Sequence, residues 1–291
     1  MHEYCILGSP KREFSANRVP SSGAQLKDVP SMGLSVAIVA MNEEASIGQT
    51  LESVRWADEI VLVDSGSTDR SCDIARQCGA KVLLKAWPGF SLQKSYAFEN
   101  CTQDWILSLD ADEVVTPGLA EEIRGVINNP AALNGYWIPR KNLFLGKWTR
   151  FGGFYPDPKL RLFRRGRGVM TGAEPHPRIA LKPEFDQRAG RLKNPMVHDA
   201  YPTLSSYMAH MNRYSSAGAR AAVAKGYRGF SFFDIVLRPM ATFIYNYFFR
   251  LGFLDGREGL LLHLYHAVYV SNKYAKIWEL TKTRSSTKGG S

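Results

Sequence analysis

Apolar runs alternate with mixed polar segments over the first third of the chain. The pattern predicts strands at residues 34–41, 59–63, 81–84 and 105–109. It predicts helices between them: one opened by Asn42 and running to about Val54, one ending at Cys78 before Gly79, and one over residues 92–101. Repeated strand–helix units of this length indicate a mostly parallel sheet with right-handed crossovers.

Polar side chains stand at the carboxyl ends of three predicted strands: Asn42, Asp64 and Asp110. Ligands of parallel α/β sheets bind outside those ends, so the three residues are expected to meet at one crevice. Neither the dinucleotide-binding glycine fingerprint nor the GKS/GKT phosphate loop follows the first strand. This argues against a nicotinamide dehydrogenase and against a P-loop NTPase.

The fourth predicted strand ends in three carboxylates, Asp110, Asp112 and Glu113. Aspartate is a poor strand former and is costly to bury, so its position at the end of a buried strand calls for a reason. A divalent cation supplies one, since Mg²⁺ and Mn²⁺ prefer oxygen ligands and commonly use one or two carboxylates plus substrate phosphates. The alternative is a simple turn in which Asp112 or Thr116 caps the next helix.

With these motifs in order, the chain resembles family 2 glycosyltransferases of the GT-A fold, and in particular the bacterial lipopolysaccharide-core β-glucosyltransferase group. The resemblance covers roughly residues 33–280. It implies a Rossmann-like α/β fold with a mostly parallel sheet flanked by helices. The matching segments are residues 40–44, 59–69, 93–94, 104–113, 152–157, 160–164 and 252–256.

The resemblance also implies roles for the nucleotide-binding residues. Asp64 would bind the base, Asn42 and Glu43 would shape the nucleoside pocket, and Lys94 would lie near the phosphates. Each has a simpler alternative in the sequence: Asn42 as a helix cap, Asp64 as a stabiliser of its own turn at Gly66, and Lys94 as a solvated helix residue.

Asp110 and Asp112 would together hold ribose, metal and diphosphate. His198 would complete the metal shell, although a single histidine is more often structural. The implied reaction is one displacement that inverts the anomeric carbon, with a carboxylate base deprotonating the acceptor hydroxyl. Glu174 is the first candidate for this base and Asp157 the second. The alternative for both is a loop residue or an ion-pair partner.

The net charge is +10 and the pI about 9.4. Much of the excess lies between Arg140 and Arg167, where nine Lys or Arg residues face a single acid, Asp157. Such a cluster favours contact with anionic lipid or phosphate; the alternative is an ordinary solvated face. Nucleic acid is not expected as a partner, because no nucleic-acid-binding module is recognisable.

Residues 230–250 and 260–270 are rich in aromatic and aliphatic side chains. Charged residues and a proline interrupt the first run, which makes it too short for a transmembrane helix. Short amphipathic helices of this kind are typical of elements lying in a membrane interface. The alternative is a helical pair packed on the catalytic domain, and both descriptions are compatible.

The predicted organisation is a disordered extension at residues 1–32, a GT-A catalytic domain at 33–205, a helical acceptor and membrane-interface region at 206–284, and a flexible tail at 285–291. No signal-peptide core precedes the first strand, and the four cysteines lack metal-binding spacing. The expected location is therefore the cytoplasmic face of a bacterial inner membrane, with peripheral attachment.

The function expected from all of this is an inverting glycosyltransferase that depends on Mg²⁺ or Mn²⁺. It would move a hexose, glucose from UDP-glucose by resemblance, onto a lipopolysaccharide-core or related glycolipid acceptor. One alternative keeps the chemistry but uses a polyprenyl phosphate or polypeptide acceptor. Another is a protein that binds nucleotide sugars or lipids without catalysis.

Overall fold

The computed structural model describes residues 32–172, 177–227 and 230–286, which belong to one structural unit. The predicted extension at 1–32 and tail at 285–291 fall outside the described residues except for Met32, Ser285 and Ser286, and the last two belong to helix α7 (Gly256–Ser286), not to a flexible tail. The predicted domain boundary near residue 205 stays a prediction; the helix that begins there starts at Leu204.

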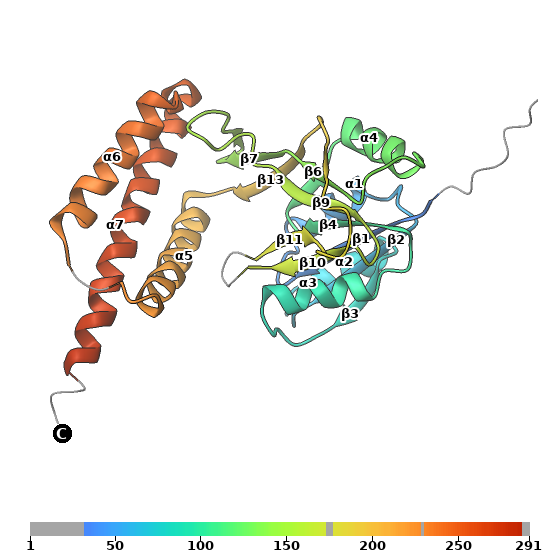
Figure 1. The fold of residues 1–291 in the computed structure, drawn as a ribbon, viewed down its shortest axis with the longest axis horizontal. Coiled ribbons are helices and arrows are strands. Elements are labelled where there is room, and N and C mark those ends of the chain that lie inside the picture. Colours follow the sequence, from blue (N-terminus) through green and yellow to red (C-terminus); the bar gives the residue numbers. More distant parts are fainter. Residues whose placement is uncertain (1–31, 173–176, 228–229, 287–291) are drawn as a thin grey trace, which may run out of the picture. The chain divides into compact units, whose positions relative to one another are not determined.

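The central sheet has seven strands in the order β12-β6-β9-β4-β1-β2-β3 (Figure 1). The four predicted strands are confirmed, and they form its parallel part, β4-β1-β2-β3. Strand β1 pairs with both neighbours, so that Ala40 lies opposite Asp64 and Val39 opposite Asp110. The ends of the three strands are therefore adjacent. The strand bounds are β1 Leu34–Ala40, β2 Glu59–Asp64, β3 Lys81–Leu84, β4 Trp105–Asp110, β6 Gly135–Ile138, β9 Lys159–Arg164 and β12 Gly190–Arg191.

Both faces of the sheet are buried, because side chains alternate between two apolar clusters along each strand. On β1, Val36 and Ile38 belong to one cluster and Ala37 to the other. The predicted helices are confirmed, with one shift: the first begins at Ile47 after Ser46, not at Asn42, whose φ of 57° places it in a turn. The helix bounds are α1 Ile47–Ser53, α2 Ser71–Gln77, α3 Phe90–Glu99 and α4 Pro117–Ile127.

A second sheet of four strands, β5-β13-β7-β8, continues from the acidic end of β4. Strand β13 lies between β5 and β7, and His198 is the register partner of Glu113 on one side and of Asn142 on the other. This pairing brings a late segment of the chain beside the Asp-x-Asp motif. The bounds are β5 Glu113–Val115, β7 Arg140–Phe144, β8 Lys147–Trp148 and β13 Met196–Tyr201, with a separate hairpin of β10 Gly168–Thr171 and β11 Arg178–Leu181.

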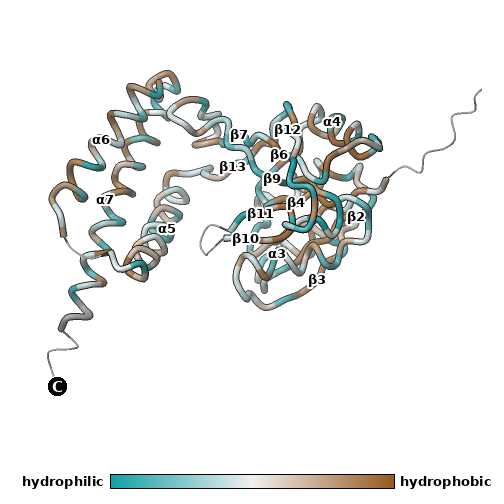
Figure 2. Tube along the Cα trace, viewed as in Figure 1, coloured by the Kyte–Doolittle hydropathy of each residue, from teal (hydrophilic) through white to brown (hydrophobic). Residues whose placement is uncertain are grey.

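The C-terminal region is helical, as predicted. It contains α5 (Leu204–Ala224), α6 (Arg238–Ile244) between π-helical turns at Phe233–Leu237 and Tyr245–Phe249, and α7 (Gly256–Ser286), which packs against α5 and α6. The expectation of a second short helix was wrong, because the run 260–270 belongs to the 31-residue α7. In the described part of the chain, no helix combines the length and apolar character needed to span a bilayer. Apolar segments recur along α6 and α7 in Figure 2.

Candidate active site

A cleft of about 1130 Å³ lies at the carboxyl end of the parallel strands. Five of the residues singled out from the sequence are among the described residues that line it: Glu43, Lys94, Asp110, Asp112 and His198. Of the three strand-end residues expected to meet there, Asp110 lines the cleft, whereas Asn42 and Asp64 do not. Strand β13 and helix α5 supply much of the remaining lining.

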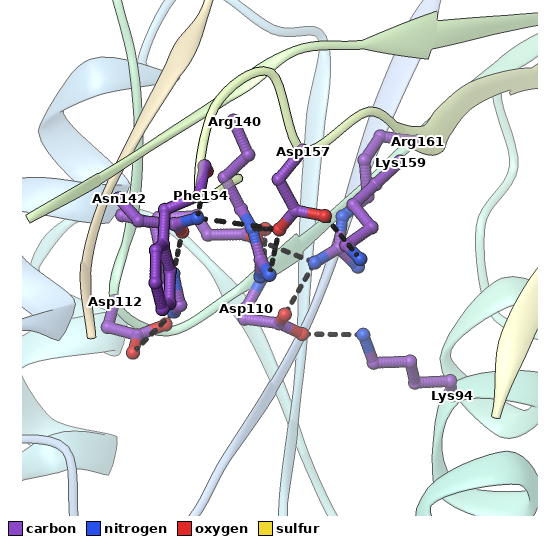
Figure 3. Close-up of polar contacts among 11 residues, drawn as sticks. Lys94, Asp110, Asp112, Arg140, Asn142, Phe154, Asp157, Lys159 and Arg161 are labelled. Atoms are coloured by element: carbon purple, nitrogen blue, oxygen red, sulfur yellow. Dashed lines mark hydrogen bonds and ion pairs between the residues drawn. The ribbon is translucent and has the colours of Figure 1, made fainter. Parts of the chain in front are cut away.

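Both oxygens of the Asp110 carboxylate are engaged by cations (Figure 3). Lys94 Nζ donates to Oδ1 at 2.5 Å, and Arg161 Nη2 donates to Oδ2 at 2.5 Å. Although burial alone would raise the pKa of Asp110, Arg161 and Lys94 hold it well below its usual value. Asp110 is thus ionised, and Lys94 is not a solvated helix residue, because only 13% of its side chain is exposed.

Glu113, a fully buried carboxylate, connects Asp110 to two arginines. It accepts from the Asp110 backbone N–H at 3.0 Å, from Arg161 Nη2 at 2.6 Å and from Arg140 Nη1 at 3.2 Å. Burying a carboxylate without such partners would cost several kcal/mol. The network therefore fixes where β4 ends relative to β7 and β9.

The cluster of basic residues between positions 140 and 167 is not one solvated or lipid-facing surface, which corrects the interpretation of that segment. Arg140 and Arg161 point into the site, where buried carboxylates compensate their charge. Charge excess in the sequence does not distinguish an arginine that neutralises a core acid from one that faces solvent.

Asp112 faces His198 rather than a helix end. Its Oδ2 lies 3.2 Å from His198 Nε2. The residue that caps helix α4 is Thr116, whose hydroxyl accepts from the Leu119 N–H. The Asp112 carboxylate is therefore available to the cleft.

The ring orientation of His198 follows from its neighbour Asn142. The Asn142 amide nitrogen donates to Phe154 O at 3.3 Å, so its oxygen faces His198 Nδ1 at 2.8 Å. The Nδ1 atom consequently donates to the Asn142 oxygen, and Nε2 faces the Asp112 carboxylate. A histidine whose second nitrogen donates to an oxygen in this way is the usual arrangement of a metal ligand.

These two residues fit a divalent cation as protein ligands. Adjacent ligands of an octahedral ion, each about 2.1 Å from it, lie about 3.0 Å apart, close to the 3.2 Å between Asp112 and His198. Among the described residues no group of three or more His, Cys, Asp or Glu side chains is arranged to hold a metal. A cation here would have Asp112 and His198 as its ligands among the described residues, with substrate phosphate and water as further ligands.

The predicted nucleoside residues lie around the ends of β1 and β2, but only Glu43 lines the cleft. Burial, together with the nearby carboxylates Asp112, Asp69 and Asp110, raises its pKa. Asn42 does not cap a helix; its side chain accepts from the Thr68 N–H at 2.8 Å and joins the two strand-end loops.

Asp64 makes the turn contacts that its simpler alternative describes, and its predicted role toward the base stays a prediction. One carboxylate oxygen accepts from the backbone N–H groups of Gly66 and Ser67, each at 2.8 Å, and the other accepts from the Ser67 hydroxyl. Its side chain is buried, and Gly66 has a φ of 101°, which glycine alone adopts easily. In this conformation Asp64 shapes the loop below the cleft.

Of the two candidate bases, only Asp157 lies among the described residues; Glu174 lies outside them. Asp157 receives two hydrogen bonds from Arg140, at 2.6 and 3.0 Å, and an ion pair from Lys159 at 2.8 Å. Against the opposing effect of burial, these cations lower the pKa of Asp157, which makes it a weak proton acceptor.

Helix α5, which falls in the predicted acceptor and membrane-interface region at 206–284, supplies cleft residues that the sequence did not single out. Tyr207, His210, Arg213, Tyr214 and Arg220 all line the cleft. The run contains no motif and no strand end, and its helical spacing is equally consistent with an ordinary amphipathic helix. Only the tertiary placement of α5 identifies it as a part of the site.

Comparison with known proteins decides the family. The family model described as "Glycosyl transferase family 2" matches residues 35–186, just over half of the chain. This chain belongs to glycosyl transferase family 2. The resemblance inferred from its motifs is confirmed, and the protein is a family 2 glycosyltransferase.

Curated relatives of this glycosyltransferase match nearly its full length. It is 28% identical over 268 residues to the lipopolysaccharide core biosynthesis glycosyltransferase LpsC of Rhizobium meliloti, covering 86% of this chain and 94% of that protein. It is 30% identical over 270 residues to an uncharacterized glycosyltransferase of Rickettsia felis, covering 87% and 90%.

Solved structures give a more distant likeness. A glucosyl-3-phosphoglycerate synthase from Mycobacterium tuberculosis, crystallised with Mn²⁺, UDP and glucosyl-3-phosphoglycerate, is 23% identical with a TM-score of 0.33. The match covers 39% of this chain and 44% of that one. The topology of the central sheet, described above, independently gives the α/β fold expected of the family.

Proposed function

We propose that this glycosyltransferase is metal-dependent and inverting, and that it transfers glucose from UDP-glucose to a lipopolysaccharide-core or related glycolipid acceptor. The observation that carries the proposal is the Asp112–His198 pair in the cleft, with the His198 ring oriented by its contact with Asn142. The full-length similarity to a lipopolysaccharide core glycosyltransferase supports the acceptor class.

In this proposal Asp112 and His198 hold Mg²⁺ or Mn²⁺. The cation would offset the charge that develops on the departing diphosphate. Lys94 lines the same cleft and is positioned to exchange its ion pair with Asp110 for a donor phosphate. Asp110 would then turn one oxygen to the ribose or to the metal, while Arg161 continues to hold the other.

Glu174 remains the proposed base for the acceptor hydroxyl. The lowered pKa of Asp157 and its bonds to Arg140 favour a positioning role for that residue instead. By holding Arg140, Asp157 keeps the arginine beside Glu113. One alternative, transfer to a polyprenyl phosphate or polypeptide, would use the same donor site with a different acceptor. The other, binding of nucleotide sugars or lipids without catalysis, would require no base.

A peripheral location on the cytoplasmic face of the inner membrane is part of the proposal. Large apolar side chains are exposed along the segment that contains α6. We define this apolar face as Phe230, Phe232, Phe233, Leu237, Met240, Ile244, Tyr245, Phe248 and Phe249. Arg250 and Arg257 follow it in the sequence and match an anionic lipid surface in charge, whereas Arg238, inside the segment, pairs with Asp234.

The central test replaces Asp112 with Asn. We expect Mn²⁺-dependent turnover of UDP-glucose, as hydrolysis or as transfer, to fall roughly 100-fold or more, because an amide is a weak ligand for a hard cation. Mn²⁺ affinity in the presence of UDP, measured by electron paramagnetic resonance, should fall in parallel. Asp199→Asn is the matched control, since Asp199 follows His198 but does not line the cleft among the described residues.

Unchanged turnover in Asp112→Asn would refute the proposed metal site. Glu174→Gln separates catalysis from binding: it should abolish transfer while UDP affinity stays within twofold. A wild-type protein that binds UDP-glucose but transfers glucose to none of the core-oligosaccharide, polyprenyl phosphate or peptide acceptors would favour the non-catalytic alternative. Transfer to one acceptor class alone would identify that class.

A further inference from the structure

Two arginines on α5, Arg213 and Arg220, line the same cleft as the proposed metal site. They are seven residues apart, which puts them on one helix face about 10 Å apart along the axis. They therefore present two guanidinium groups to the same cleft.

The charge of these two arginines is not compensated in the way that the other cleft cations are. Lys94 pairs with Asp110, and Arg140 pairs with Glu113 and Asp157. Within residues 32–172, 177–227 and 230–286, no ion pair to a carboxylate involves Arg213 or Arg220. We call the cleft-lining residues of α5 the α5 wall: Tyr207, His210, Arg213, Tyr214 and Arg220. The α5 wall consequently presents net positive charge to the cleft.

An aromatic pair lies on the same wall. The rings of His210 and Tyr214 are stacked, with centroids 4.0 Å apart and an interplanar angle of 13°, and both residues line the cleft. Tyr214 also lies within electrostatic range of Asp110 and Asp112, whose charges add to burial in raising its pKa. A ligand on the α5 wall therefore borders directly on the site proposed for the donor.

The size of the cleft allows a second ligand beside a nucleotide. Binding pockets for a single small molecule occupy about 300–1,000 Å³, and this cleft has about 1130 Å³. The donor diphosphate already has partners in the proposed metal site and Lys94. The arginine pair is thus left for an anion on the other substrate.

We infer that Arg213 and Arg220 bind a phosphate or carboxylate group carried by the sugar acceptor. The guanidinium group suits this role, because its planar array of donors matches the two oxygens of either anion. The inference rests on the proposed function and narrows its acceptor to an anionic sugar. An uncharged sugar acceptor would leave both arginines without a partner.

The test measures binding, using glucose 6-phosphate as an anionic sugar probe and glucose as its neutral counterpart. Each is titrated calorimetrically into the full-length protein loaded with UDP and Mn²⁺. The double variant Arg213→Gln/Arg220→Gln should bind glucose 6-phosphate about tenfold more weakly or worse, because it loses the charge-assisted hydrogen bonds to the anion. Its affinity for UDP with Mn²⁺ should stay within twofold of wild type.

Lys225→Gln is the matched control. Lys225 is the C-cap residue of α5 and is not among the described residues that line the cleft. A parallel loss of UDP affinity in the double variant would overturn the inference and assign the arginines to the donor diphosphate. Equal binding of glucose and glucose 6-phosphate by wild type, or an unchanged double variant, would also overturn it. If wild type fails to bind UDP yet prefers glucose 6-phosphate through these arginines, the anion site stands and the proposed function fails.

Discussion

At the scale of single residues, the partners of each carboxylate decide what it can do. Asp110 and Asp112 are two positions apart, yet Asp110 is held between two cations and Asp112 faces a histidine. Asp64 stands at an equivalent strand end but satisfies the amides of its own turn. Three similar residues at one edge of a sheet therefore have different chemistry, because different neighbours reach them.

A buried histidine away from the proposed catalytic residues gives a prediction for stability. His263 on α7 is only 1% exposed, and neither ring nitrogen has a hydrogen-bond partner among the described residues. Burial is the largest cause that lowers its pKa from 6.5 to about 4; the neighbouring His266 and Arg250 lower it further, and Asp255 opposes them. The folded protein therefore holds this ring neutral at pH values where the unfolded chain protonates it.

The free energy of unfolding should fall as the pH drops from about 6.5 towards about 4, because protons then bind the unfolded state preferentially. His263 should contribute about 2 kcal/mol of this loss between pH 6.5 and pH 5. His263→Leu removes the titrating group, so urea unfolding of this variant should depend less on pH by that amount. Parallel pH profiles for the variant and wild type would contradict the assignment; the remaining slope belongs to His266 and the carboxylates.

At the scale of helices and strands, the elements with strong local patterns were the ones that the sequence could predict. The four parallel strands are apolar runs, and polar residues stand at or just after the ends of three of them. Local pattern also explains the error at Asn42. An asparagine followed by two acids is typical of a helix start, but Asn42 instead bonds to the loop after β2, a contact that depends on strand pairing.

The partners of the site residues could not be predicted in the same way. Arg140 is on β7, Arg161 on β9 and His198 on β13, and each reaches the end of β4 only through long-range pairing of these strands. Nothing in the sequence near Asp110 indicates which of many arginines will neutralise it. The residues of α5 that line the cleft could not be identified from the sequence for the same reason.

The apolar face around α6 gives a prediction at the scale of one element. Replacing Phe248 and Phe249 (54% and 75% exposed) with Ser should weaken binding to vesicles containing anionic lipid, roughly tenfold for the pair, because apolar area buried in the interface is lost. Co-sedimentation with vesicles of phosphatidylglycerol and phosphatidylethanolamine measures this.

Leu92→Ser is the control for that experiment, since Leu92 is also highly exposed (61%) but lies on α3 of the catalytic region. Binding that is equal for wild type and the double serine variant would show that the apolar face does not contact lipid. Self-association of wild type without vesicles, lost in the double variant, would indicate a protein partner instead.

At the scale of the whole molecule, a short motif joins the C-terminal helices to the strands beside the cleft. The buried carboxylate of Asp255 accepts from the backbone N–H groups of Arg150 at 3.1 Å and Phe151 at 2.9 Å, just after β8. Gly252 precedes it, where a Cβ atom would lie 2.1 Å from His263. The segment 252–256, matched from the sequence as a family motif, thus has a structural role: it fixes the start of α7.

Asp255→Ala should destabilise the protein by about 2–4 kcal/mol, because it leaves two backbone N–H groups without acceptors in a buried position. The midpoint of thermal unfolding should fall by roughly 5–10 °C, and Asp255→Asn, which keeps one acceptor oxygen, should lose less.

Since α5 packs on α7 and lines the cleft, loosening the start of α7 should also weaken binding on the α5 wall more than binding of UDP. Glu258→Gln, which affects only an exposed ion pair with Lys147, should change neither property. An Asp255→Ala protein that unfolds like wild type would mean that α7 is held by its helix contacts alone.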